Sequence, residues 1–278
     1  ISFVLGTQQS SFIFEAADMD GNGIVKVNDV TSIINLVLAQ GTGAKARSAR
    51  FAAKKTASVD TPKLYAEAFA IEPGDTKDVS IMLDNPETEA NGWQADIKLP
   101  DGLSFALNAK GKYVTAIDYD RTDGYSITSQ LQADGSVRVV GVNMNNDAIW
   151  DTSGKIMTIR VKADDDLTAG VYNISLSNVS LSDMASNDVV LSDSKCSALS
   201  GDLSSAKTLT LYGGWTEDAM NDLNGKISGN TAITSVDMSD ASYVANVAVS
   251  AGNKNTLFYI PQPGWLSNAS TINVLLRN

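Results

Sequence analysis

The feature that most constrains the fold is an alternation of apolar and polar residues from Leu64 to about Ser200. A period of two places one face of a strand in a core and leaves the other face in water. Turn sequences such as Pro73-Gly74-Asp75 separate the runs, and about eight to nine short strands of this kind predict an antiparallel β-sandwich. The clearest runs are Val79, Ile81 and Leu83; Trp93, Ala95, Ile97 and Leu99; Met157, Ile159 and Val161; and Tyr172, Ile174 and Leu176.

Composition removes several classes of function. The chain has 278 residues, a formal net charge of −11 and no histidine. The negative charge argues against nucleic acid or an anionic membrane as partner, because both repel it. The lack of histidine excludes Ser-His-Asp and Cys-His nucleophile arrangements. A hydrolase would need a carboxylate pair, and none stands out among the 32 Asp and Glu residues. We therefore predict a protein that is not an enzyme, without a membrane span.

A twelve-residue acidic loop near the start of the sequence has the side chains of a calcium site. Its positions 1, 3, 5 and 12 carry oxygen-bearing side chains, and position 7 contributes a backbone carbonyl. These positions are Asp18, Asp20, Asn22, Asp29 and, for the carbonyl, Ile24. Gly23 stands at position 6, where the chain must turn sharply. The alternative is an Asx-rich turn that caps a helix, but such a turn requires neither this glycine nor an acid at position 12.

A helix is expected directly after this loop. Val30, Ile33, Ile34, Val37 and Leu38 fall at the spacing of one apolar helical stripe. Two glycines follow at positions 41 and 43, as is typical of a helix end.

The loop and its helix together resemble one repeat of a type I dockerin module, in which position 12 is Asp and the entering helix of an EF-hand is missing. Ile1, Val4 and Leu5 have the same spacing as Ile34, Val37 and Leu38, so the chain is expected to start inside the helix of a first repeat. The resemblance implies a Ca²⁺-binding, EF-hand-like helix pair over residues 1–43, N-terminally truncated but with an intact second repeat.

A basic stretch separates this module from the strands. Residues 44–61 are rich in Ala, Ser and Thr and carry five basic residues, at positions 45, 47, 50, 54 and 55. We predict a solvated linker here. An alternative is that this stretch lies along an acidic neighbour and sets the angle between domains.

The strand-rich segment, residues 62–202, resembles a cohesin-like sandwich in the order of its motifs. Glu72-Pro-Gly-Asp-Thr76 precedes a strand, the strand with Trp93 runs into Leu99-Pro-Asp-Gly-Leu103, and Gly154-Lys-Ile156 opens a late strand. The resemblance implies the fold, and it does not imply that this domain binds a dockerin.

The remaining residues, 203–278, suggest a short coil of parallel strands. Asn230-Thr-Ala-Ile233-Thr-Ser-Val236-Asp-Met238 resembles the core motif of bacterial leucine-rich repeats. Alignment on Leu209, Val236, Leu257 and Ile272 gives two intervals within the usual repeat length and one that is too short. A short helix is expected from Glu217, with Thr216 as its cap. The coil has too few turns to stand alone, so it must dock on the sandwich or continue into a further domain.

Aromatic residues offer a second type of site. Trp150, in a loop-like stretch, and Tyr125 form a possible carbohydrate-binding pair, because aromatic faces suit sugar rings. The alternative is ordinary core packing, which we expect for Trp93 because it shares a strand face with Ile97.

These observations predict a multi-domain, mainly β protein that is non-catalytic and secreted or on the cell surface of a bacterium. Calcium modules of this kind suit extracellular calcium. The expected role is adhesion, or assembly of carbohydrate-handling complexes through protein partners or through packing within the chain. The alternatives are a carbohydrate-binding module and an accessory part of a polysaccharide-degrading enzyme.

Overall fold

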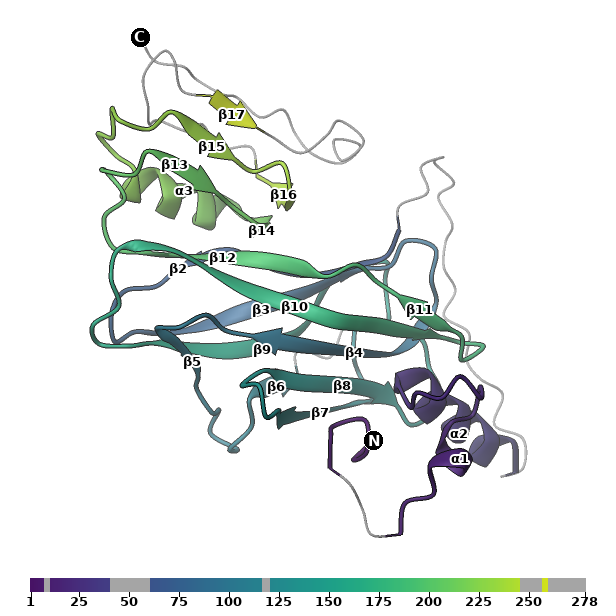
Figure 1. The fold of residues 1–278 in the computed structure, drawn as a ribbon. Coiled ribbons are helices and arrows are strands. Elements are labelled where there is room, and N and C mark those ends of the chain that lie inside the picture. Colours follow the sequence, from purple (N-terminus) through teal and green to yellow (C-terminus); the bar gives the residue numbers. More distant parts are fainter. Residues whose placement is uncertain (8–10, 41–60, 117–120, 246–256, 260–278) are drawn as a thin grey trace.

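A computed structural model describes residues 1–7, 11–40, 61–116, 121–245 and 257–259. Its centre is a sandwich of two β-sheets, with helices α1 and α2 on one side and a small coil of strands with α3 on the other (Figure 1). Apart from residue 61, the predicted basic linker lies outside the described residues. In the described part of the chain, no helix is both long enough and apolar enough to cross a membrane.

The first sheet of the sandwich has five strands. Their order is β1 (Lys63–Ala66), β3 (Thr76–Asp84), β9 (Ser153–Ala163) and β5 (Leu103–Phe105), and β6 (Val114–Ala116) also pairs with β9. All of these pairs are antiparallel. The turn before β3 contains Gly74 with a φ of 79°, as its Pro-Gly-Asp sequence predicts.

The second sheet has seven strands. Their order is β2 (Phe69–Ala70), β12 (Ser194–Ser200), β10 (Gly170–Asp183), β4 (Ala90–Lys98), β8 (Val137–Asn143) and β7 (Tyr125–Leu131), with β11 (Asp188–Val190) paired to β10. The pairing of β2 with β12 is parallel, and the others are antiparallel. The predicted sandwich is therefore confirmed, but the expected strand number was too low, because β2, β6 and β11 are too short to show a period.

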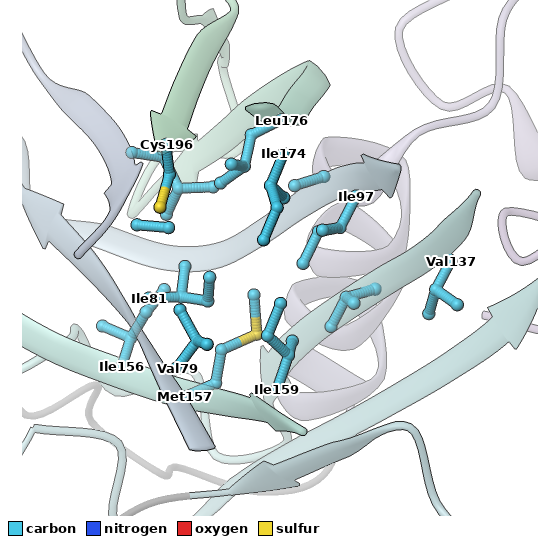
Figure 2. Close-up of a cluster of buried hydrophobic side chains, with 14 of the residues drawn as sticks. Val79, Ile81, Ile97, Val137, Ile156, Met157, Ile159, Ile174, Leu176 and Cys196 are labelled. Atoms are coloured by element: carbon cyan, nitrogen blue, oxygen red, sulfur yellow. The ribbon is translucent and has the colours of Figure 1, made fainter. Parts of the chain in front are cut away.

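The core lies between the two sheets and is built from the alternating residues. Figure 2 shows side chains of β3 and β9 pointing toward those of β4, β8, β10 and β12. Ile81, Ile97, Ile159 and Ile174 are fully buried there. Burying one such side chain contributes about 1.5–3 kcal/mol. Trp93 belongs to the same core and is fully buried, as its position in the strand predicts.

The C-terminal coil contains parallel strands, as expected. β13 (Thr208–Thr210), β15 (Ser235–Asp237) and β17 (Leu257–Tyr259) form one sheet, and β14 (Gly213–Trp215) pairs with β16 (Ala241–Val244). Leu209 pairs with Val236 as aligned, but Val236 pairs with Phe258, so the expected alignment on Leu257 was wrong by one residue. Such a slip is easy because apolar residues are adjacent there. Ile272 lies outside the described residues.

The coil docks on the sandwich through a shared core. Helix α3 (Glu217–Lys226) follows β14 and packs against β2. Its predicted cap is confirmed, since the Thr216 hydroxyl accepts a hydrogen bond from the Ala219 N–H at 3.2 Å. Buried Leu223 and Trp215 of the coil lie in one cluster with Leu199 of β12. This shared cluster stabilises a coil that has too few turns to be stable by itself.

The N-terminal part packs against the opposite end of the sandwich (Figure 1). A one-turn helix α1 (Phe14–Ala17) precedes the acidic loop, and α2 (Val27–Gln40) follows it. Residues 1–7 form a single turn, with Leu5 N–H bonded to the Ile1 carbonyl. This turn ends in a Schellman arrangement, because Thr7 bonds back to Ser2 and Gly6, with a φ of 85°, bonds back to Phe3.

The buried face of α2 differs from the predicted stripe. Val30 and Ile34 are buried as expected, but Val37 is 61% exposed and Ile33 is 37% exposed. The face that packs instead includes Val27 and Thr31, which are 0% and 1% exposed. Apolar residues occur on two adjacent faces of α2, so its sequence alone does not decide which face is buried. The sheet buries the face that carries Thr31.

Candidate metal centre

The acidic loop brings three carboxylates together. One oxygen from each of Asp18, Asp20 and Asp29 lies within 4.8 Å of the others. Asp18 follows the last residue of α1, whereas Asp29 lies in the first turn of α2. The loop therefore folds back so that its first and twelfth positions meet, as the spacing of a calcium loop requires.

Asp29 is the anchor of the loop. Its side chain is fully buried, and Oδ1 accepts hydrogen bonds from the N–H of Met19 at 2.8 Å and of Asp20 at 3.4 Å. The other oxygen, Oδ2, accepts from the N–H of Lys26 at 2.8 Å. One carboxylate thus holds both ends of the loop, and Asp is long enough to do so where an EF-hand has Glu.

The opposite side of the loop is organised by Asp18. Its Oδ1 accepts from the Asn22 N–H at 3.1 Å, and its Oδ2 accepts from the Gly23 N–H at 2.9 Å. Gly23 has a φ of 82°, which confirms the sharp turn predicted at position 6. Gly21 also has a positive φ, of 72°, so two glycines let the backbone close around the carboxylates.

The other proposed ligands are placed around the same turn. Asp20 accepts from the Asn28 side-chain amide at 2.8 Å, and Asn22 Oδ1 accepts from the Ile24 N–H at 2.8 Å. The Ile24 side chain is exposed, in keeping with a position whose ligand would be the backbone carbonyl. Ligation by these five residues stays a prediction.

The charge balance of the loop favours a cation. Among the described residues, none of the three carboxylates forms an ion pair with Lys or Arg. Lys26, the one basic residue within the loop, instead pairs with Asp188 of β11 at 2.8 Å. Three negative groups, one of them buried, therefore stand together without a positive side chain. A hard divalent cation with a preference for oxygen ligands matches this donor set.

The loop and α2 are attached to the sandwich by polar contacts that begin at the loop itself. The N–H of Val27 donates to Gln94 Oε1 of β4 at 3.0 Å in a buried position. The hydroxyls of Thr31 and Ser182, on β10, lie 2.5 Å apart. Gln94 thereby satisfies an N–H at the helix start that has no partner within the helix.

Close packing of α2 depends on a glycine in β4. A Cβ atom at Gly92 would lie 2.9 Å from Val27 Cγ2 and 3.1 Å from Thr31 Cγ2. Gly92 is in register with Val142 of β8 on one side and Ser182 of β10 on the other. These three strands therefore present one outer surface to the helix.

One sequence pattern indicates that the outer surface of β8 is covered, although the alternation used to predict the strands does not. Val139 faces the sandwich core, but Val140 and Val142 belong to a second cluster with Val27 and Ile34 of α2. A run of valines in which both faces of β8 are apolar indicates a strand covered on both sides. Gln94, Ser182 and Asp188 carried no comparable signal, because polar residues on an outer face are ordinary.

The N-terminal turn completes the cover over β8. Val4 and Leu5 are buried in the cluster that contains Val140 and Val142. The carbonyl of Val4 accepts from Arg138 Nη1 at 3.1 Å, and that of Leu5 accepts from Gln132 Nε2 at 3.0 Å. Residues before the acidic loop and residues after it therefore cover the same sheet.

The two aromatic candidates have different environments. Trp150 is 57% exposed, as its loop-like sequence predicts. Tyr125 is half-buried, its ring packs on Trp93 at 5.2 Å between centroids, and its hydroxyl donates to the Asp147 carbonyl at 2.7 Å. Burial raises the pKa of the Tyr125 hydroxyl. The structure thus ties Tyr125 to the core aromatic and leaves Trp150 as the exposed member of the pair.

Comparison with known proteins gives structural similarities alone. No protein-family model and no curated protein matches the chain. Similar solved structures include the sixth cohesin of scaffoldin B from Acetivibrio cellulolyticus, in complex with a dockerin. It is 13% identical over 51% of this chain and 99% of that chain, with a TM-score of 0.44.

Two further cohesins show a comparable likeness. A non-cellulosomal cohesin from Archaeoglobus fulgidus is 12% identical over 51% of this chain and 92% of its own, with a TM-score of 0.42. The cohesin module of a Clostridium perfringens family 33 glycoside hydrolase is 12% identical over 51% of this chain and 96% of its own, with a TM-score of 0.41. These TM-scores are below 0.5, so the similarities support no conclusion by themselves. The two-sheet fold is established by the strand pairing.

Proposed function

We propose that this chain is a non-catalytic, calcium-stabilised module for protein assembly or adhesion. The observation that carries the proposal is the buried Asp29 carboxylate, which joins the acidic loop to the first turn of α2. Lys26 and Val27, three and two residues earlier, bond directly to the sandwich. The ion would therefore support the docking of α2 on the sandwich, and it would do no chemistry.

The ion acts through mass action in this proposal. A ligand that binds the folded state alone stabilises it by about 2.7 kcal/mol when its concentration is 100 times Kd. Without a cation, repulsion among Asp18, Asp20 and Asp29 opposes the folded loop. Calcium suits the site better than magnesium, because Mg²⁺ demands stricter octahedral geometry and keeps its waters.

The first prediction concerns thermal stability. Millimolar Ca²⁺ is expected to raise Tm by several degrees, since about 1 kcal/mol corresponds to roughly 2–4 °C in a domain of this size, and Mg²⁺ is expected to raise it less. Differential scanning calorimetry with and without EDTA measures both. The double variant Asp18→Ala with Asp20→Ala serves as control and should not respond. A wild-type protein whose Tm ignores calcium would rule out the site, whereas a double variant that still responds would place the ion elsewhere.

Secretion or cell-surface location, and a role in carbohydrate-handling complexes, form part of the same proposal. Calcium at millimolar concentration is an extracellular condition, to which weak extracellular calcium modules are tuned. The dockerin-like loop and the cohesin-like order of sandwich motifs both support an assembly role. The partner would be a protein, bound through surfaces of the sandwich or the helices.

A second candidate function is carbohydrate binding, and the exposure of Trp150 favours it. We predict that Trp150→Ala abolishes any binding on a glycan array while leaving Tm unchanged, because the exposed ring contributes little to the core. Tyr125→Phe is the matched control. It removes the hydroxyl that bonds to Asp147 and keeps the packing on Trp93, so it should lower Tm but retain binding. Equal glycan binding by wild type and Trp150→Ala would exclude this candidate.

A further inference from the structure

The sequence contains three Asn-Gly pairs, at residues 22–23, 91–92 and 224–225. Asparagine is a thermolabile residue, and in such a pair the glycine nitrogen can attack Cγ of the asparagine and close a cyclic imide with loss of ammonia. Glycine favours the attack because it has no side chain that hinders its nitrogen. The three pairs have different environments in the fold, and only one of them suits this reaction.

Two of the pairs are held in regular structure. Asn91 is fully buried in β4, a strand with a neighbour on each side, β8 and β10. Asn224 and Gly225 lie inside α3, where helical geometry holds each N–H toward a carbonyl of the preceding turn. In both places the surrounding structure would have to open before the glycine nitrogen could reach the asparagine side chain. These two pairs therefore serve as internal references.

Asn22 and Gly23 are instead exposed in the acidic loop. No atom lies within 4 Å of a Cβ built on Gly23, so there is space beside the pair for a water molecule. Asn22 Oδ1 accepts a hydrogen bond from the Ile24 N–H at 2.8 Å. The ring that this bond closes contains both Asn22 Cγ and the Gly23 nitrogen, so the two reacting atoms are held in one tight turn.

The hydrogen bonds of this pair also favour the reaction. The Gly23 N–H donates to Asp18 Oδ2 at 2.9 Å, and a carboxylate at this distance can take the proton of the attacking nitrogen. The Ile24 N–H polarises the side-chain carbonyl of Asn22, the group that is attacked. The loop thus supplies a proton acceptor at the nucleophile and a hydrogen-bond donor at the electrophile.

We propose that Asn22 is a site of spontaneous deamidation, and that a cation bound in the acidic loop suppresses the reaction. The Gly23 nitrogen gives its proton to Asp18 and bonds to Asn22 Cγ. The bond between Cγ and Nδ2 then breaks, and Nδ2 takes up that proton and leaves as ammonia. Water opens the imide at one of its two carbonyl groups, which leaves aspartate or isoaspartate at position 22.

The suppression rests on the metal site proposed above, whereas the reaction itself does not. Asp18 and Asn22 are both expected ligands, so a cation would turn their oxygens toward itself and remove the proton acceptor of Gly23. Ligation would also hold the Asn22 side chain away from the Gly23 nitrogen. If only the empty loop reacts, the rate falls by the ratio of bound to empty protein, about 100-fold at a cation concentration of 100 times Kd.

The aspartate product would change how the loop depends on the cation. Asn22 Nδ2 donates to Asp20 Oδ2 at 2.8 Å, and in the product two carboxylates would meet at this contact. A further negative group is then added to Asp18, Asp20 and Asp29. The empty loop becomes less stable and the cation is bound more tightly, so ageing of the protein increases its dependence on calcium.

Peptide mapping by mass spectrometry tests the reaction on the full chain. The protein is incubated in EDTA or in millimolar Ca²⁺ at equal ionic strength, and fragment spectra locate the mass increase caused by exchange of NH₂ for OH. In EDTA, Asn22 is expected to convert at least roughly tenfold faster than Asn91 and Asn224, because both references require local opening. Calcium should slow conversion of Asn22 by about 100-fold at 100 times Kd and leave the references unchanged.

The possible outcomes separate this proposal from the previous one. If Asn22 stays intact in EDTA, or converts no faster than Asn91 and Asn224, the deamidation site is wrong. If it converts equally fast with and without calcium while calcium raises Tm, the suppression is wrong. If neither conversion nor Tm responds to calcium, the metal site is wrong and the deamidation site stands.

A variant tests the consequence of the reaction. Asn22→Asp carries the charge of the product, so its Tm in EDTA should be lower than that of wild type and its rise with calcium should be larger. Asn22→Gln is the matched control, because it keeps a neutral amide and should not gain calcium affinity. Equal calcium responses of Asn22→Asp and wild type would overturn the predicted effect of ageing on the loop.

Discussion

Replacing Asp29 with alanine is expected to release α2 from the sandwich and to remove the response to calcium. The substitution deprives the N–H groups of Met19, Asp20 and Lys26 of their acceptor. A hydrogen bond to a charged acceptor contributes about 1.5–3 kcal/mol, and because these three bonds are only part-buried, the total loss is on the order of a few kcal/mol. Docking of α2 begins at the adjacent Val27, and it should fail with the loop.

Hydrogen exchange followed residue by residue measures this effect. Amides of α2 should lose protection in Asp29→Ala, whereas those of β3 and β9 in the sandwich core should keep it. Asp29→Asn is the matched control, because it keeps one acceptor oxygen but loses the charge. It should retain part of the protection without calcium and gain none when calcium is added. Full protection of α2 in Asp29→Ala would show that this carboxylate does not anchor the loop.

Replacing Gly141 with alanine is expected to have the largest effect on the sandwich itself. Gly141 of β8 is in register with Trp93 of β4, and the indole lies across it. A Cβ atom at this position would lie 2.2 Å from Trp93 Cζ2, far inside van der Waals contact. Overpacking a core typically costs about 1–3 kcal/mol and occasionally more. Because Trp93 is fully buried between the sheets, we expect the upper end of this range or failure to fold.

Chemical denaturation of the purified variants tests this expectation. Gly225→Ala is the matched control, since no atom lies within 4 Å of its added Cβ and Gly225 lies within α3. Alanine in a helix is favoured over glycine by about 0.5–1 kcal/mol, so this variant should be slightly more stable. Adding Trp93→Phe to Gly141→Ala should recover part of the loss by freeing space. A Gly141→Ala protein as stable as wild type would contradict the close approach of indole and β8.

Much of the sandwich could be predicted because its cause is local. Alternation in β3 and β9 places Val79, Ile81 and Ile159 on one face without reference to any partner. Turns at Gly74 and Gly102 need positive φ, and the sequence supplies glycine at both. The shortest strands escaped prediction, since two or three residues, as in β2 and β11, carry no measurable period. Their pairing depends on the neighbouring strands β12 and β10.

The acidic loop was predictable for a similar reason. Its carboxylates meet because twelve residues with glycine at position 6 close on themselves, and the bonds of Asp18 and Asp29 lie within the loop. The face of α2 was not predictable in this way. Ile33 and Val37 are as apolar as Ile34, and they are exposed because the sheet offers no surface to them.

By itself the sequence determined the elements whose causes lie within a few residues: the alternating strands, the glycine turns, the capped helix α3 and the closed acidic loop. Only the tertiary structure decided which helix covers which face of the sheet. Gly92, Gln94 and Ser182 form a surface for α2 because three strands place them side by side, although β10 follows β4 after some 70 residues of sequence. Packing and hydrogen bonding act over a few ångströms, so contacts between distant segments are settled only when the fold brings those segments together.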